Sequence, residues 1–396
     1  MNEKLVPKRR FSGFTDFWEK CAVKEICSIS TGKSNTQDKV DDGRYPFYVR
    51  SQIIERSNRY LYDEESVLTV GDGVGTGKVF HYVNGKYDLH QRVYRMFNFN
   101  SDILPKYFYY YFSNHFYQRV MTMTAKTSVD SVRYEMISEM NILFPSLEEQ
   151  KRISGFIDYL DNLIVSQQKK LNKAKAMKSA YLSEMFPADG ERKPKRRFAG
   201  YTEDWRGCVL GDLIEKLYNG QTPSRFKDEN WNGEINWLSS GELNRGIVNS
   251  TIEKITDVGQ KDANLKIVPK DTFVIAITGL EATGTRGNCA ILGIDTTLNQ
   301  SCMAIFPKES VLDSAFLFQW YRKVGEEYGI KYTQGTKQQS YNAELIKLLP
   351  ITVPKIDEQK KIGKFFTNLD NLITSQQQKL DKLKDMKKAY LNEMFI

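Results

Sequence analysis

The stretch PSLEEQKRISGFIDYLDNLIVSQQKKLNKAKAMKSAYLSEMF, from Pro145 to Phe186, decides the architecture because the chain contains it twice. It returns from Pro354 to Phe395 as PKIDEQKKIGKFFTNLDNLITSQQQKLDKLKDMKKAYLNEMF, with 26 of 42 positions identical. A shorter string is also repeated: PKRRFSGFTDFW begins at Pro7 and PKRRFAGYTEDW begins at Pro194. The residues between these strings barely align. The chain is therefore a duplicated domain, and its repeat is too long for a solenoid. We call the repeated strings the frame, and the residues between them the two divergent interiors.

Both copies of the long repeat carry apolar residues at alternating spacings of four and three, from Ile153 to Met185 and from Ile362 to Met394. This average of 3.5 residues is typical of a coiled-coil seam, and Gln167 and Gln376 occupy matching polar positions within it. The pattern predicts two long helices, the first over about 147–185. Because only a short linker follows the first helix, the second helix must run back beside it. We expect an antiparallel pair related by a pseudo-two-fold axis.

The remaining stretches alternate strand-like runs with turn-rich segments, which predicts mixed α/β domains. The fold class is therefore α+β, with two mixed α/β domains separated by two long antiparallel coiled-coil helices. The aromatic-rich run from Phe108 to Phe112 is expected to pack in a core helix. The predicted domain boundaries are 1–145 for the first domain, 146–187 for the first helix, 188–353 for the linker and second domain, and 354–396 for the second helix.

The composition is that of an ordinary soluble protein. The 396 residues include 57 Lys and Arg against 49 Asp and Glu, a net charge of +8 that suits a polyanionic partner but does not require one. The five cysteines form no C-x-x-C pair and the three histidines lie apart from them, so we expect neither a disulfide framework nor a metal site. No segment is apolar enough to span a bilayer, which favours a cytoplasmic protein without membrane contact.

Together these features resemble the specificity (S) subunits of type I restriction–modification systems over nearly the whole chain. The strings PSLEEQKRI and PKIDEQKKI each begin a long helix, and each PKRRF string precedes a globular domain. In the first domain YPFYVRS and GDGVGTGKV also resemble family landmarks. In the second domain GQTPS, INWLSSGEL and LNQSCMAIFP do the same. The short strings are weak alone, whereas the order domain, helix, domain, helix is specific.

The resemblance implies a DNA-reading scaffold. Each domain would be a target recognition domain that reads one half of a bipartite, asymmetric site in double-stranded DNA. The helices would set the spacing between the half-sites and dock two modification subunits, which are adenine methyltransferases. Restriction subunits would add ATP-driven translocation and cleavage. The two recognition domains resemble different subtypes, so base contacts cannot be transferred from one to the other.

No motif in the chain predicts catalysis. It lacks the N-P-P-F or D-P-P-Y strings of adenine methyltransferases, a cofactor-binding glycine motif and a helicase Walker pair. Methylation of a paired adenine requires the base to be flipped into an enzymatic pocket, which this chain does not encode. We expect a non-catalytic protein without a cofactor. The competing interpretation is a non-catalytic coiled-coil adaptor with two protein-binding domains; DNA binding that weakens steeply with salt would separate the two.

Candidate DNA contacts are polar side chains in loops, because Gln pairs with adenine while Lys and Arg bind guanine or phosphate. In the first domain they are Arg50, Gln52, Arg56, Arg59, Lys78, Lys126, Thr127, Ser128 and Arg133. In the second domain they are Arg225, Arg286, Lys337, Gln338 and Gln339. For each of them an ordinary solvated surface residue is the alternative.

Two basic features have more than one interpretation. Lys78 ends the string GDGVGTGK, which fails the Walker spacing because five residues separate Gly71 from Gly77 and Val79 follows the lysine. A loop that approaches DNA phosphate and a plain glycine-rich turn both remain open. The strings KRRF (Lys8 to Phe11) and KPKRRF (Lys193 to Phe198) look like localisation signals, but their place at a domain boundary favours a solvated linker or a phosphate-facing arm.

Overall fold

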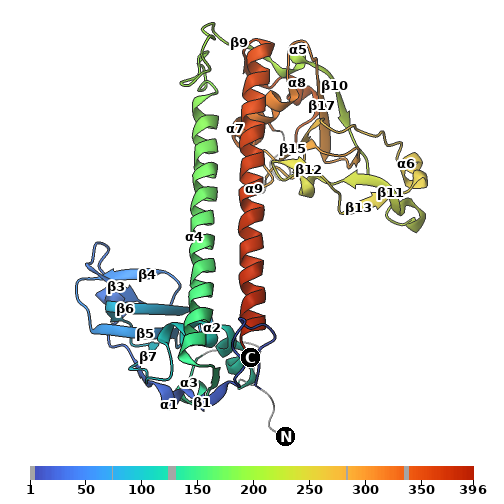
Figure 1. Ribbon diagram of the computed structural model, residues 1–396. Helices are drawn as coiled ribbons and strands as arrows, with labels where there is room; N and C mark the ends of the chain where they lie inside the picture. Colours follow the sequence, from blue (N-terminus) through green and yellow to red (C-terminus); the bar gives the residue numbers. More distant parts are fainter. Residues whose placement is uncertain (1–4, 74, 124–130, 282–283, 334–338) are drawn as a thin grey trace. The chain divides into compact units, whose positions relative to one another are not determined.

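The computed structural model describes residues 5–73, 75–123, 131–281, 284–333 and 339–396. It divides into two compact units. Unit 1 comprises Met1–Gln168 and Lys379–Ile396, and unit 2 comprises Lys169–Gln378. The two predicted long helices are confirmed as α4 (Leu147–Glu184) and α9 (Ile356–Met394), which are both unbroken and contribute to both units (Figure 1). The domain boundaries expected from the sequence separate each long helix from the globular domains, whereas the two compact units each include parts of both helices. Those boundaries stay a prediction.

Unit 1 contains a six-stranded sheet in the order β2-β7-β5-β6-β3-β4. All neighbouring strands are antiparallel except β3 and β6, which are parallel. The strands are β2 (Ser28–Thr31), β3 (Tyr45–Tyr48), β4 (Ile54–Ser57), β5 (Tyr62–Val70), β6 (Phe80–Leu89) and β7 (Val93–Phe97). A separate pair joins β1 (Glu19–Ala22) to β8 (Asn141–Phe144). The helical elements are α1 (Val23–Ile26), η1 (Thr36–Asp38), α2 (Pro105–Thr122) and α3 (Tyr134–Ser138).

Unit 2 contains a five-stranded sheet, β10-β17-β14-β15-β12, and a three-stranded sheet, β13-β11-β16. Their strands are β10 (Ile214–Asn219), β11 (Trp231–Leu238), β12 (Ile247–Val248), β13 (Glu253–Ile255), β14 (Phe273–Ala276), β15 (Cys289–Leu292), β16 (Thr297–Leu298) and β17 (Cys302–Pro307). A two-stranded sheet pairs β9 (Arg206–Val209) with β18 (Pro350–Val353). The helical elements are α5 (Leu210–Leu213), η2 (Asp228–Asn230), η3 (Ser240–Glu242), α6 (Asp257–Asp262), α7 (Ser314–Lys331) and α8 (Ala343–Lys347).

The two units share a core topology although their sequences diverge. The antiparallel order β2-β7-β5-β6 in unit 1 corresponds to β10-β17-β14-β15 in unit 2. In each unit the second strand of this order, β7 or β17, is followed along the chain by an 18-residue helix, α2 or α7. The units differ in their additions, because β3 and β4 extend the sheet of unit 1 whereas β11 and β13 belong to a separate sheet in unit 2. The predicted α+β class with an internal repeat is confirmed.

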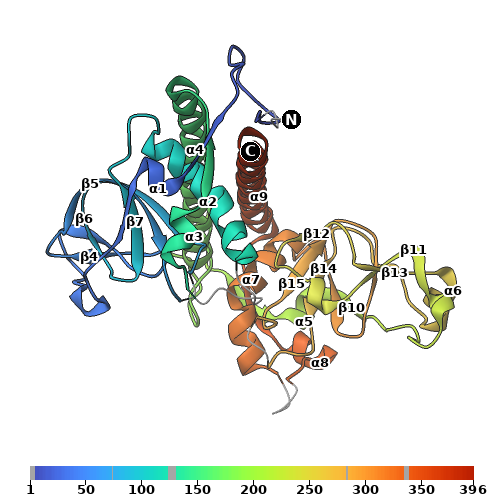
Figure 2. The same ribbon diagram turned by 90° about the horizontal axis from the view of Figure 1, so that it is seen from below.

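Helix α2 has the core position that its aromatic residues predict. Tyr107, Phe108, Phe112 and Phe116 are fully buried. Phe112 and Phe116 stack with ring centroids 4.3 Å apart. Figure 2 shows α2 beside the sheet of unit 1 and near α4, so the aromatic rings fill the space between these elements.

The repeated Glu–Gln motif (Glu149–Gln150 and Glu358–Gln359) forms the same bonds in both units. In unit 1 the Gln150 amide donates to the carbonyls of Asp102 and Pro145, both at 2.8 Å, and its oxygen accepts the Leu104 N–H at 2.9 Å. In unit 2 Gln359 makes the equivalent three bonds, to Val311, Pro354 and Asp313, at 2.9–3.0 Å. One glutamine thus satisfies three backbone groups at the start of each long helix.

The motif glutamates explain the repeated arginines. Glu149 is buried and accepts two bonds of 2.7 Å from Arg10, and Glu358 is buried and accepts two bonds of 2.7 Å from Arg197. The preceding arginines pair on the surface instead: Arg9 with Glu393 and Arg196 with Glu184. The KRRF strings are therefore not merely solvated or phosphate-facing, since their second arginine neutralises a buried carboxylate.

Within each unit the two long helices pack antiparallel. In unit 1 Phe156 of α4 meets Tyr390 of α9 edge to face, with centroids 4.8 Å apart. In unit 2 Tyr181 of α4 meets Phe365 of α9 in the same way at 5.0 Å. The predicted seam is buried at Ile153, Ile157, Leu171, Ile362 and Leu380. Within the described residues, no helix is sufficiently long and apolar to cross a membrane.

The buried arginine pair yields a stability prediction. Arg197→Met leaves Glu358, whose side chain is 1% exposed, without its counter-charge, so we expect a loss of about 3 kcal/mol in the free energy of unfolding. Arg196→Met is the matched control, because the Arg196–Glu184 pair is largely exposed and should matter little. Urea unfolding of both variants measures the difference. Equal stability of the two variants would contradict the prediction.

Candidate functional site

In unit 1 the glycine-rich loop between β5 and β6 is where several candidate residues meet. Asp72 in this loop accepts a bond from Arg50 Nη1 at 3.3 Å and lies 3.6 Å from Arg92 Nε. Gly73 and Gly77 have φ angles of +85° and +68°, which favour glycine. The glycines therefore serve the backbone of a turn, and Asp72 in this turn brings together basic side chains from two other segments.

The same loop is held against the segment between α2 and α3. The Val132 N–H donates to the Gly71 carbonyl at 2.7 Å, and Asp72 forms a bridge with Ser131. Arg133 follows directly and is exposed. Lys78, at the other end of the loop, is exposed and lies 4.7 Å from the ring centroid of Tyr117. Arg50, Lys78 and Arg133 therefore belong to one edge of unit 1.

The other predicted arginines of unit 1 make internal bonds. Arg56 donates to the carbonyls of Gly43 and Arg44 at 2.8 and 2.9 Å, which ties β4 to the turn before β3. Arg59 donates to Ser34 at 3.0 Å and to Asp38 at 2.9 Å, and its Nε lies 3.6 Å from the buried Asp88.

Gln52 is exposed in the loop between β3 and β4. Lys126, Thr127 and Ser128 lie outside the described residues.

Unit 2 repeats this arrangement with different side chains. In the loop between β14 and β15, Arg286 donates to the carbonyls of Leu280 and Glu281 at 2.6 and 3.1 Å. Its Nη2 also lies 3.5 Å from Gln339 Oε1. The Gln339 N–H donates to Glu281 at 3.1 Å, and the Leu280 N–H donates to the Gln339 carbonyl at 3.2 Å. Arg286 and Gln339, which are far apart in sequence, thus meet. Lys337 and Gln338 lie outside the described residues.

Arg225 occupies a separate place in unit 2. Its guanidinium carbon lies 3.7 Å from the ring centroid of Trp231 and 5.2 Å from that of Trp237. It also forms a two-bond ion pair with Glu253. This pair raises the pKa of Arg225 and lowers the pKa of Glu253 through their hydrogen bonds. Phe226, next in sequence, is fully exposed.

Sequence reasoning missed two arginines that the structure adds to these loops. Arg92, in the turn between β6 and β7, faces Asp72. Arg245 of unit 2 donates to the Arg286 carbonyl and to Asn288 at 3.2 Å. Burial lowers the pKa of His90, and the positive charges of Arg50 and Arg92 lower it further, so the basic edge of unit 1 favours the neutral imidazole. Among the described residues, no group of His, Cys, Asp and Glu side chains could hold a metal ion.

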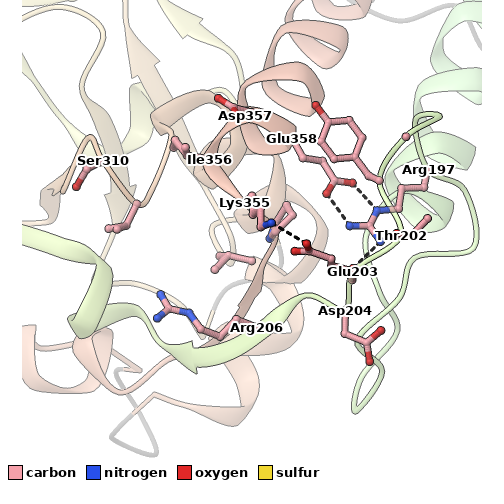
Figure 3. A pocket seen from close by; sticks show the side chains of 15 residues that line it. Arg197, Thr202, Glu203, Asp204, Arg206, Ser310, Lys355, Ile356, Asp357 and Glu358 are labelled. Atoms are coloured by element: carbon pink, nitrogen blue, oxygen red, sulfur yellow. Dashed lines mark hydrogen bonds and ion pairs between the residues drawn. The ribbon is translucent and has the colours of Figure 1, made fainter.

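A cleft of about 720 Å³ lies elsewhere in unit 2, between the PKRRF segment, β18 and the start of α9 (Figure 3). Arg197 binds Glu358 on its wall, and Lys355 Nζ donates to Glu203 at 2.7 Å. The wall residues therefore come from the two repeated strings and their surroundings. The cleft is a feature of the repeated frame, whereas the divergent loops lie outside it.

Comparison with known families identifies the repeated domain. The family model described as the type I restriction modification DNA specificity domain matches residues 16–176 and 202–385. One match falls in each copy of the internal repeat, and together they cover most of the chain. The chain therefore belongs to the type I restriction–modification specificity family and carries its DNA specificity domain twice. The resemblance noted from the sequence is confirmed.

Particular relatives agree with this assignment. The chain is 26% identical over 426 residues to the putative type I restriction enzyme MjaX specificity subunit of Methanocaldococcus jannaschii, covering 98% of the chain and 95% of the relative. It is 22% identical over 398 residues to the MjaVIII specificity subunit of the same organism, covering 95% and 91%. The Escherichia coli EcoR124I/EcoR124II specificity subunit is 26% identical over 234 residues, which cover 58% of the chain but only 54% of that relative.

Solved structures share the fold. The crystal structure of the type I restriction–modification S subunit from M. genitalium has a TM-score of 0.71 at 13% identity, with 99% of both chains covered. A chain from a structure titled for complex assembly and conformational transition of the type I R-M system has a TM-score of 0.55 at 15% identity, covering 96% of this chain and 97% of that one. At these identities the likeness establishes the fold alone.

The Arg225–Glu253 pair gives a prediction about titration. Arg225 stabilises the charged form of Glu253, so Arg225→Ala should raise the pKa of Glu253 toward its ordinary value of 4.5. In the unmodified chain the pair stabilises the fold above that value, and this contribution is lost as the pH falls through the lowered pKa. NMR titration of the carboxyl carbons measures the shift. Lys227→Ala, which removes the ion pair of Asp262 instead, is the control, and an unchanged pKa of Glu253 in Arg225→Ala would contradict the assignment.

Proposed function

We propose that each unit reads one half of a bipartite, asymmetric site in double-stranded DNA. The observation that carries this proposal is the repeated frame around two different sets of loops. The frame keeps the same bonds in both units, whereas the glycine-rich loops carry Lys78 in one unit and Arg286 in the other. Two different loop sets suit two different half-site sequences.

The loops between β5 and β6 and between β14 and β15 are the proposed DNA contacts. Arg50, Lys78, Arg92 and Arg133 give the edge of unit 1 several positive charges for phosphate or guanine. In unit 2 Gln339 lies against Arg286, and a glutamine of this kind suits an adenine edge. Arg56 and Arg59 make internal bonds, so we assign them the role of holding β4 and the segment that follows it against the turn before β3 and against η1.

We further propose that two modification subunits dock on the repeated frame, one on each copy. Support comes from the duplication itself, since each equivalent surface of the frame occurs twice in the chain. The cleft at the start of α9 belongs to this surface. Lys173 and Lys382 are exposed at equivalent positions of the two helices and could meet acidic groups of such a partner.

The chain itself is proposed to be non-catalytic. Methylation would come from the modification subunits, and cleavage from restriction subunits that join the same complex. The helices α4 and α9 would set the distance between the half-sites. A coiled-coil adaptor with two protein-binding domains is the competing proposal, but the family assignment favours the DNA reader.

Exchange of one domain tests the division of labour. A chain whose residues 195–353 come from another family member should methylate a site with one half changed and the other half retained, because each unit reads its half with its own loops. Mapping of methylated adenines in a host that also makes the modification subunit measures this. The reciprocal exchange of residues 8–145 is the control. A change in both halves from one exchange would overturn independent reading.

The number of modification subunits is open to direct measurement. Native mass spectrometry of the assembled methyltransferase should show two modification subunits per chain, because the frame is repeated. Lys173→Glu combined with Lys382→Glu should weaken this assembly, while the DNA affinity of the chain alone should change less. A stable complex that holds one modification subunit would rule out equivalent docking.

A further inference from the structure

Two ion pairs join the long helices α4 and α9, and they occupy equivalent positions of the repeat. In unit 2 Lys178 of α4 binds Asp370 of α9, and in unit 1 Lys387 of α9 binds Asp161 of α4. Lys178 lies at a seam position and is only 4% exposed. A lysine buried among apolar seam residues requires a carboxylate partner, because an unpaired charge there has lost its water.

Each aspartate also binds the helix of its own globular domain. In unit 2 Asp370 accepts bonds from Arg322 at 3.0 Å and from Gln319 at 3.1 Å, both on α7. In unit 1 Asp161 accepts a bond from Tyr110 of α2 at 3.0 Å. Tyr110 and Gln319 are equivalent positions of the repeat. Asp161 and Asp370 are therefore junctions at which α4, α9 and a domain helix meet.

The spacing of these residues favours one register of the helices. Asp161 precedes Lys178 by the same number of residues as Asp370 precedes Lys387, so a single antiparallel register satisfies both pairs. An apolar seam alone would tolerate a slip of one heptad.

A slipped register finds no replacement for the aspartates. One heptad to either side of Asp370 the chain has Gly363 and Gln377. One heptad to either side of Asp161 it has Ser154 and Gln168. None of these residues is a carboxylate, so a slip of one heptad leaves both lysines without their counter-charges.

We propose that Asp161 and Asp370 are positioning residues that determine how many unread base pairs separate the two half-sites. They hold the helix register, and in the same contact they fix each recognition domain to that register. This inference rests on the proposed function, in which each unit reads one half-site. In this inference, two charged contacts determine the half-site spacing together with the length of the helices.

The test replaces both pairs by apolar residues of similar size, with Asp161→Leu, Lys387→Met, Asp370→Leu and Lys178→Met in one chain. Such replacements of a whole buried pair are often tolerated. A slip of one heptad moves the helices by ~10 Å at 1.5 Å per residue. This displacement corresponds to about three base pairs at ~3.4 Å per base pair. We expect methylation of the same half-site sequences at the native spacing and also at spacings that differ by about three base pairs.

Sequencing of methylated adenines, with the modification subunit present, gives the spacing for every variant. Asp385→Leu with Lys388→Met removes one acidic and one basic exposed residue from α9 and is the control expected to keep a single spacing. Restoring one pair in reversed order, with Asp161→Lys and Lys387→Asp in the apolar background, should recover the single native spacing. Such a recovery would show that the complementary charges fix the register, whichever helix carries the acid.

A single native spacing in the fourfold variant would overturn the inference. If that variant does not assemble, Asp161→Asn with Asp370→Asn removes the charges and keeps polar contacts, and a single native spacing there overturns the inference equally. Failure of the proposed function has a different signature, because the unmodified chain would then direct no methylation of a bipartite site.

Discussion

The structure depends on a buried carboxylate at the first turn of each long helix. Glu149 and Glu358 are almost inaccessible to water, so each must be neutralised, and the bidentate pairs with Arg10 and Arg197 do this. The glutamine that follows each glutamate satisfies backbone groups before the domain helix and before the long helix. A string of a few residues thereby connects three segments: the PKRRF string, the globular core and the helix. This explains why the frame is the part that the two copies share.

The end of a long helix forms the same backbone bond with a PKRRF segment in both units, although only in unit 2 does that segment follow the helix directly in the sequence. In unit 2 the backbone N–H of Arg196 donates to the carbonyl of Glu184 at 2.8 Å, and the chain itself runs from one to the other. In unit 1 Arg9 donates to the carbonyl of Glu393 at 2.8 Å, although these residues lie at opposite ends of the sequence. In unit 1, therefore, noncovalent contacts alone join the end of α9 to the PKRRF segment. Each long helix therefore ends against the PKRRF segment of one copy.

The long helices could be predicted because their period is a local property of the sequence, and burial of Ile153 or Leu380 follows from it. The role of Arg10 could not, because its partner Glu149 is 139 residues away and a basic string suggests a solvated arm. The period also placed Lys178 in the seam, but its partner on α9 depends on the register. Arg92 was missed for a similar reason. Its neighbour Asp72 belongs to another turn, and the sequence alone does not show that the two turns meet.

A frame held by paired buried charges leaves the loops free to change. Breaking one partner of such a pair is costly, so Arg197 and Glu358 constrain each other strongly. The loops between β5 and β6 and between β14 and β15 combine side-chain bonds of Asp72 and Arg286 with backbone bonds, such as Val132 to Gly71 and Leu280 to Gln339. Backbone bonds place few demands on the side chains that project from the loop. Different residues can therefore occupy equivalent loop positions, and recognition can diverge between the copies without loosening the frame that carries them.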